Sequence, residues 1–203
     1  MMRASGYAVL LSLCLVAPFS RAAAQGDPRL ERLDEATRPV VVALIDTARA
    51  VGLPVNPLVE RALEGAIKGA PGATIATAVR RLAADLGRAR DALGPGASPV
   101  ELDAGAAALR AGAGPDVLTR LRRARGHRPV TMALAVLTDL VARGVPIDTA
   151  TTAVLTLAAT ARDEDLVDFR RAVERDIAIG APPAAAASIR VNAAAREARP
   201  GRP

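Results

Sequence analysis

The spacing of apolar residues along the chain predicts helices. The clearest stripe lies within residues 72–93, where apolar side chains recur at steps of three and four: Ile75, Val79, Leu82, Leu86, Ala89 and Leu93. Such spacing places one apolar seam along about six helical turns. Shorter stripes with helical spacing lie within residues 133–141, 147–157 and 166–177. We therefore expect a chain built from amphipathic helices.

Turn signals separate these stripes at several places. Gly-x-Pro occurs at residues 52–54, 69–71, 144–146 and 180–182, and residues 112–115 carry a variant with one extra residue. Glycine favours the left-handed conformation that ends a helix, and a proline soon after it prevents the helix from continuing. Each signal therefore predicts the end of one helix and the start of the next.

Signals for helix starts follow these helix ends along the chain. Residues Ser98-Pro99-Val100-Glu101, for example, have the pattern of a capping box with proline at the first helical position. Taken together, the signals define ten segments. We expect helices at residues 28–37, 39–51, 57–68, 72–93, 99–111, 115–125, 130–143, 148–160, 163–179 and 183–195.

Composition supports an all-α fold. Alanine makes up about a quarter of the 203 residues, there is no Trp, and only one Tyr and two Phe occur, so helix formers dominate and strand formers are scarce. The sequence predicts an array of short helices paired as αα-hairpins with Gly-x-Pro turns. Hairpin starts near residues 57, 99, 130 and 163 are spaced within the range of helical-hairpin solenoids. A solenoid-like stack and an irregular bundle both fit this spacing.

Residues 1–24 have the features of a cleaved signal peptide. Arg3 is followed by the apolar run 7–19, and three alanines precede Gln25, which matches the order of a positive region, a hydrophobic region and a small-residue cleavage site. The apolar run is shorter than the roughly 20 residues that a membrane-spanning helix needs. We expect an exported protein, periplasmic or extracellular, that has no transmembrane helix after cleavage.

Cleavage of residues 1–24 changes which interactions can stabilise the fold. Cys14, the only cysteine, lies within it, so a disulfide is not available and packing must stabilise the mature chain. We expect a single helical domain over residues 25–191 and a disordered tail rich in Arg, Ala and Pro over residues 192–203.

Residues that carry chemistry are scarce. His127 is the only histidine, and Lys68, the only lysine, follows no glycine-rich phosphate loop, so neither a Cys/His metal site nor a nucleotide-binding loop is indicated. Asp163, Asp165 and Asp168 lack the glycine and distal glutamate of a calcium loop, and we assign them to a helix N-terminus. We expect no cofactor, no metal and no catalysis, with an enzyme that uses carboxylates alone as a second alternative.

One charged cluster stands out in a chain whose formal net charge is +6. Its members are Arg120, Arg122, Arg123, Arg125 and Arg128. A guanidinium patch of this kind suits an anionic polymer, a lipid head group at a membrane surface or an acidic protein, and it also complements the end of the helix expected at 115–125. No aromatic residue lies near it for base stacking, so nucleic acid is not the expected partner.

From this inventory we expect a non-catalytic interaction or scaffold protein of the cell envelope or secreted space, whose partner is a protein. Repeated apolar-faced hairpins stack into extended surfaces, which supports this expectation. The alternative is an anion binder that acts through the arginine cluster.

Overall fold

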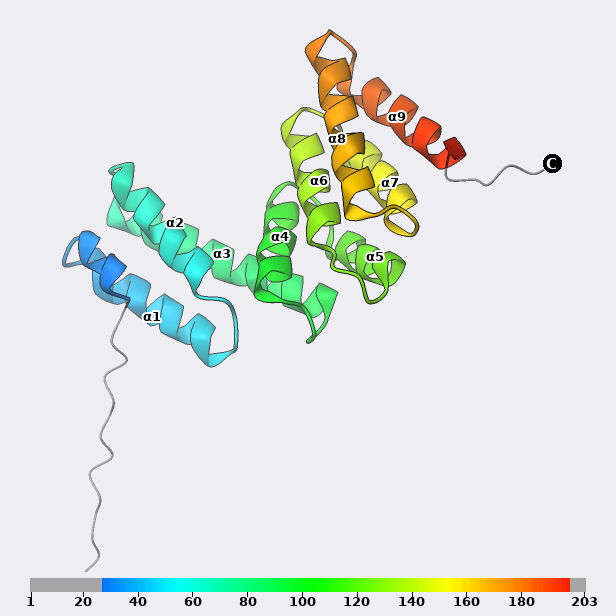
Figure 1. Cartoon of the computed structure of the whole chain (residues 1–203). Coiled ribbons are helices and arrows are strands. Elements are labelled where there is room, and N and C mark those ends of the chain that lie inside the picture. Colours follow the sequence, from blue (N-terminus) through cyan, green and yellow to red (C-terminus); the bar gives the residue numbers. More distant parts are fainter. Residues whose placement is uncertain (1–26, 198–203) are drawn as a thin grey trace, which may run out of the picture.

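The computed structural model describes residues 27–197. Within them the chain forms nine α-helices, one 3₁₀ helix and no strand (Figure 1), which confirms the predicted all-α array. The elements are η1 (Pro28–Arg32), α1 (Thr37–Ala50), α2 (Asn56–Ile67), α3 (Gly72–Leu93), α4 (Pro99–Arg110), α5 (Pro115–Arg125), α6 (Thr131–Ala142), α7 (Ile147–Ala158), α8 (Asp163–Ala178) and α9 (Pro183–Glu197). None of these helices is both long enough and apolar enough to span a bilayer.

The N-terminal part is built around α3. Helices α1 and α2 both pack against α3, and η1 packs against α1 and α2. The Thr37 side chain at the start of α1 lies against Gly72 at the start of α3, and Arg90 near the end of α3 donates to the Val51 carbonyl just after α1 at 2.6 Å. Helix α1 therefore runs alongside α3 in the same direction.

From α3 onward the helices form a stack of two layers. One layer contains α4, α6 and α8, and the other contains α3, α5, α7 and α9, with each helix packed against the helix two elements further along the chain. Figure 1 shows these helices rising from the end of α3 to α9. Packing between elements two apart is the arrangement of a helical solenoid, in which each hairpin contacts its neighbours.

The stack has a repeat of sixteen residues, which is stricter than the hairpin spacing predicted from the sequence. Helices α4 to α8 begin sixteen residues apart, and in each of them the fourth and seventh residues are buried. The fourth positions are Leu102, Leu118, Leu134, Ala150 and Leu166, and the seventh are Gly105, Leu121, Leu137, Ala153 and Phe169. Leu86 and Ala89 continue the same register back into α3 and are also buried.

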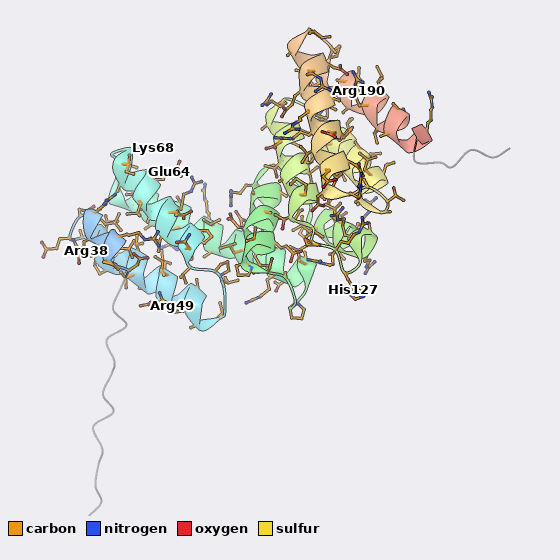
Figure 2. All side chains as sticks on the ribbon, in the orientation of Figure 1. Arg38, Arg49, Glu64, Lys68, His127 and Arg190 are labelled. Atoms are coloured by element: carbon orange, nitrogen blue, oxygen red, sulfur yellow. The ribbon has the colours of Figure 1, made fainter. Side chains whose placement is uncertain are left out.

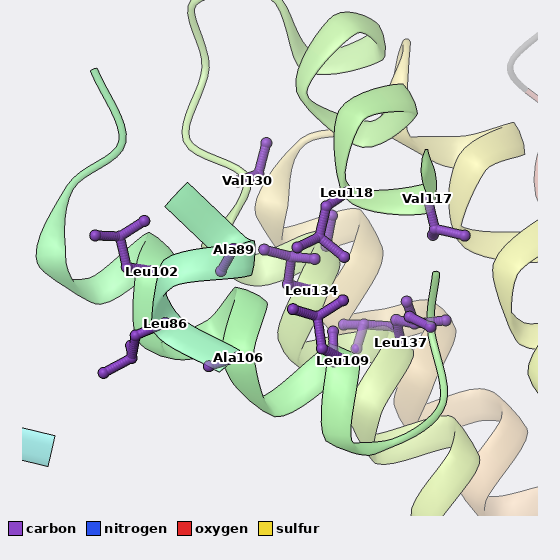
Figure 3. Packing of buried hydrophobic residues seen from close by; sticks show 14 of the residues in the cluster. Leu86, Ala89, Leu102, Ala106, Leu109, Val117, Leu118, Val130, Leu134 and Leu137 are labelled. Atoms are coloured by element: carbon purple, nitrogen blue, oxygen red, sulfur yellow. The ribbon is translucent and has the colours of Figure 1, made fainter. Parts of the chain in front are cut away.

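These register positions form the centre of the hydrophobic core. Figure 3 shows Ala89 of α3 near Leu118 of α5 and Leu134 of α6, side chains that come from both layers. Leu86, Leu118 and Leu134 are fully buried. Burying a leucine side chain contributes roughly 1.5–3 kcal/mol, so each of the leucines at this position stabilises the stack.

The Gly-x-Pro signals mark the helix ends as predicted. Gly144, which follows α6, has a φ of +85°, and its N–H donates to the Val141 carbonyl at 3.0 Å. The Val145 N–H then donates to the Leu140 carbonyl at 3.0 Å, and the Val145 side chain is buried. This pair of bonds is a Schellman motif. The same two bonds recur at Gly52, Gly69, Gly112 and Gly180.

Two segments differ from the sequence-based expectation by more than two residues. A single helix was expected over residues 28–37, but η1 ends at Arg32 and α1 begins at Thr37. The Asp34 carboxylate accepts hydrogen bonds from the backbone N–H groups of Ala36 and Thr37 at 3.1 and 2.8 Å, so this side chain starts a new helix instead of continuing the first one.

The second difference is at the C-terminal end. The disordered tail was expected to begin at residue 192, whereas α9 continues to Glu197 and the Ala194 side chain packs against the core. Residues 198–203 of that tail lie outside the described residues, as does the expected signal peptide at 1–24.

Candidate binding sites

The arginine cluster expected to face a ligand is divided by the fold. Helix α7 ends at Ala158 without a glycine, and the Arg128 side chain takes over the role of its cap. Arg128 donates to the carbonyls of Ala158, Ala159 and Ala161 at 2.9, 2.7 and 2.9 Å. The last carbonyls of a helix have no partner within the helix, and a cation there is favoured by the helix dipole. Arg128 therefore holds the end of α7.

Arg125 contacts the same α7–α8 junction, and its side chain is buried. It is only 4% exposed, donates to the carbonyls of Pro129 and Ala161 at 3.0 Å each, and pairs with Asp163 at the start of α8. The planar guanidinium can satisfy several acceptors at once, which the single ammonium of a lysine does less well. Arg125 thus ties the α5–α6 turn to the α7–α8 turn.

Arg122 pairs with Glu101 at a different junction, where α4, α5 and α6 meet. The Glu101 carboxylate accepts from the Arg122 guanidinium at 2.6 Å and from the backbone N–H groups of Val130 and Ser98 at 2.9 Å each. Burial raises the pKa of Glu101, but these N–H donors and the Arg122 charge outweigh burial and lower the pKa to about 2. The predicted capping box is present, and it also joins α4, α5 and α6.

Only Arg120 and Arg123 of the cluster are exposed, and neither makes an ion pair or side-chain hydrogen bond within residues 27–197. His127 is also exposed and projects from the α5–α6 turn (Figure 2). The surface left for an external anion is therefore smaller than the five residues expected from the sequence.

A groove lies elsewhere, between the last three helices. It has a volume of about 590 Å³ and is formed by α7, α8 and α9; we refer to it as the α7–α9 groove. Leu157, Phe169 and Ala172 contribute apolar lining from α7 and α8, and Ala193 contributes from α9. Phe169 is the one aromatic residue within residues 27–197. The volume lies within the roughly 300–1,000 Å³ typical of ligand sites.

Acidic side chains border this apolar lining. Asp165 and Asp168 of α8 line the α7–α9 groove, and both belong to the helix N-terminus assigned from the sequence. The Asp165 carboxylate accepts from the backbone N–H of Arg162 at 2.8 Å, and this bond together with the Arg162 side chain lowers the pKa of Asp165. Asp168 is largely exposed and lies 3.7 Å from Arg171. At neutral pH the groove therefore combines an apolar lining with two carboxylates and the guanidinium of Arg190, which is paired with Asp176 at 2.7 Å.

Sequence reasoning did not find the α7–α9 groove because its lining comes from three helices. The one available signal was Phe169, the single aromatic residue left after the expected cleavage. Apolar spacing placed Phe169 on the buried face of its helix, where it does lie, but spacing could not show that a groove reaches its ring.

Within residues 27–197 no three His, Cys, Asp or Glu side chains are grouped so as to hold a metal ion. The carboxyl groups with a clearly shifted pKa are all lowered, namely Asp27, Asp34, Glu64, Glu101, Asp165 and Asp176. A general acid that acts at neutral pH needs a raised pKa, so these six groups serve as hydrogen-bond acceptors and fixed charges.

Comparison with known proteins gives no relative: no family model matches the chain, and no match is found among curated proteins or solved structures.

Proposed function

We propose that the mature chain is an exported, non-catalytic helical protein that acts by binding another protein, and that the α7–α9 groove receives a segment of that partner. The observation that carries the proposal is a groove built by the last helices of the stack, in which apolar side chains lie beside the carboxylates of Asp165 and Asp168. Apolar anchors surrounded by polar groups are the usual anatomy of a peptide-binding site.

The chemistry of the groove defines the kind of segment it suits. An apolar side chain of the partner would pack against Ala172 and Ala193, and a neighbouring Lys or Arg would pair with Asp165 or Asp168. Because Asp168 is largely exposed, its pairing contributes specificity more than affinity. The preferred partner is therefore a segment in which a basic residue stands next to a large apolar one.

Peptide selection tests this proposal directly. Short random peptides displayed on phage would be selected on the chain from Gln25 onward, and the enriched peptides would then be assayed against the double variant Ala172→Arg/Ala193→Arg, which fills the groove. We expect enriched peptides with adjacent basic and apolar residues, and binding at least about tenfold weaker to the filled variant. A matched control is Ala43→Arg/Ala84→Arg, which adds the same side chains at exposed helical positions and should bind like the unmodified protein.

The charge of the groove is tested with the same peptides. Asp168→Lys should weaken binding, and so should about 1 M salt, where the Debye length is only about 3 Å. Enriched peptides that bind the filled variant as well as the unmodified protein would refute the assignment of the groove, and so would selection that yields no common pattern.

Export is tested independently of the groove. The support for it is the sequence of residues 1–24, with its positive, apolar and small-residue regions. Fractionation of the native host should find the protein outside the cytoplasm, with Gln25 as its N-terminal residue. An intact Met1 in the cytoplasmic fraction would contradict both export and cleavage.

A further inference from the structure

A second groove lies along one face of α3, where the N-terminal helices meet the stack. It has a volume of about 600 Å³, and we refer to it as the α3 groove. Its floor includes Thr74, Thr77 and Arg81 of α3, which follow one another at helical spacing, and its walls include Arg61 of α2 and Arg110 of α4. Three guanidinium groups from three different helices therefore line one concave surface.

Two of these guanidinium groups are available to a ligand. Arg81 and Arg110 are exposed and make no ion pair or side-chain hydrogen bond within residues 27–197. Arg61 is partly engaged, since its guanidinium lies 2.8 Å from Glu64 at a site where both side chains are about 40% exposed. An exposed pair of this kind is weak, so Arg61 can turn to a stronger partner.

The remaining polar groups of the groove do not cancel this positive charge. Asp85 also lines the groove, but its carboxylate is already paired with Arg88 at 2.6 Å. Thr77 donates its hydroxyl proton to the Ala73 carbonyl at 2.8 Å, whereas the Thr74 hydroxyl makes no hydrogen bond within the described chain and can donate. The donors that remain free are thus two guanidinium groups and one hydroxyl.

We infer that the α3 groove binds a small ligand that carries two or more oxyanion groups, such as a tricarboxylate or a diphosphate. Guanidinium groups bind carboxylate and phosphate through two parallel hydrogen bonds each. Arg81 and Arg110 come from different helices, so each can hold one oxyanion, with Arg61 and Thr74 completing the set. This site is separate from the α7–α9 groove and from the arginine cluster at residues 120–128.

Isothermal titration calorimetry on the chain from Gln25 onward tests the inference, with citrate and inorganic pyrophosphate as probes at constant ionic strength. We expect saturable binding of at least one probe, and whichever binds more tightly identifies carboxylate or phosphate as the preferred group. The double variant Arg81→Gln/Arg110→Gln should bind at least about tenfold more weakly, because it loses two charge-assisted contacts.

The matched control is Arg80→Gln/Arg123→Gln, which removes the same charge. Arg80 is the neighbour of Arg81 on α3 and is exposed without lining the groove, and Arg123 belongs to the exposed part of the cluster. This variant should bind within about twofold of the unmodified protein. Equal weakening by both double variants would show a general charge effect and overturn the inference, as would the absence of saturable binding for both probes.

A second variant tests the same site independently, so that the inference can still be refuted if Arg81→Gln/Arg110→Gln does not fold. Ala78→Glu places a negative charge on the groove lining, where Ala78 is half-buried, and it should also weaken binding at least about tenfold. Unchanged binding to a folded Ala78→Glu protein, judged by circular dichroism, would contradict the site. The filled α7–α9 variant should bind citrate or pyrophosphate normally, so the two groove assignments can fail separately.

Discussion

At the scale of single residues, arginine is the main structural cation of this protein. Arg122, Arg125 and Arg128 come from one short stretch of sequence, yet each binds backbone carbonyls or a carboxylate at a junction between helices. Arg120 and Arg123, from the same stretch, remain exposed. The five cluster residues therefore differ in role in a way that mutation can measure.

We predict that Arg128→Met lowers the free energy of unfolding by about 1–3 kcal/mol, because three carbonyls at the end of α7 lose a charged donor. Arg123→Met should stay within about 0.5 kcal/mol of the unmodified protein. Urea denaturation followed by circular dichroism measures both. Equal effects would show that the Arg128 contacts do not stabilise the folded chain.

Glu101 gives a pH-dependent prediction. Its folded pKa of about 2 lies below the ordinary value of 4.5, so its contribution is fully present above about pH 4.5 and is lost as the pH falls toward 2. At pH 7 that contribution is on the order of 3 kcal/mol.

Glu101→Gln should therefore lower the free energy of unfolding at pH 7 and flatten its decline between pH 4.5 and 2. Urea titrations across that range provide the measurement. Asp103→Asn changes an exposed carboxylate on the same helix that has no ion pair in the described chain, and it should keep the pH dependence of the unmodified protein.

At the scale of elements, most helix boundaries followed from local signals. Helices α3 and α5 begin and end where the sequence predicted, because a proline or glycine and an apolar seam mark both ends. The expected helix at 28–37 was wrong because Asp34 caps a new helix within this range. The sequence pattern does not distinguish a capping aspartate from an aspartate inside a helix.

Gly87 and Gly105 both lie within helices, but only Gly105 is closely packed. Substituting alanine at each position therefore distinguishes the cost of close packing from the gain in helix propensity. A Cβ at Gly87 would meet nothing within 4 Å, whereas at Gly105 it would lie 3.0 Å from the Ala89 Cβ and 3.2 Å from both Leu118 and Leu93. Gly105 stands at a register position where the other helices of the repeat carry larger residues. Its lack of a side chain therefore lets α4 approach α3 closely.

We predict that Gly87→Ala raises the free energy of unfolding by about 0.5–1 kcal/mol, the usual gain in helix propensity. Gly105→Ala should lower it, because three core neighbours would have to move and overpacking typically costs about 1–3 kcal/mol. Thermal and urea denaturation distinguish the two signs. A stabilising Gly105→Ala would show that the α3–α4 interface relaxes freely.

At the scale of the whole molecule, the sixteen-residue register makes stability a sum of contacts between neighbours. Helices α5 and α6 pack on a helix before and after them in their own layers, whereas α9 packs only on α7 within its layer of the described chain. In such stacks, end units open more readily than central ones. The α7–α9 groove thus lies at the less stable end.

Hydrogen exchange should reveal this gradient. We expect backbone amides of α9 to exchange at least about tenfold faster than those of α5 and α6 under native conditions, as measured by mass spectrometry on peptic fragments. A ligand in the α7–α9 groove should slow exchange in α9. Equal protection from α4 to α9 would mean that the stack opens as one cooperative unit.

The sequence by itself determined the helices and their turns, because apolar spacing, glycine ends and proline starts act within a few residues of one another. The tertiary structure decided which groups the charged side chains contact. The carbonyls that accept from Arg128 lie 30 to 33 residues away in the sequence, and the Glu101 carboxylate is 21 residues from Arg122. Both grooves likewise combine side chains from three helices. Such partners meet only after the helices have packed, so no local pattern encodes them.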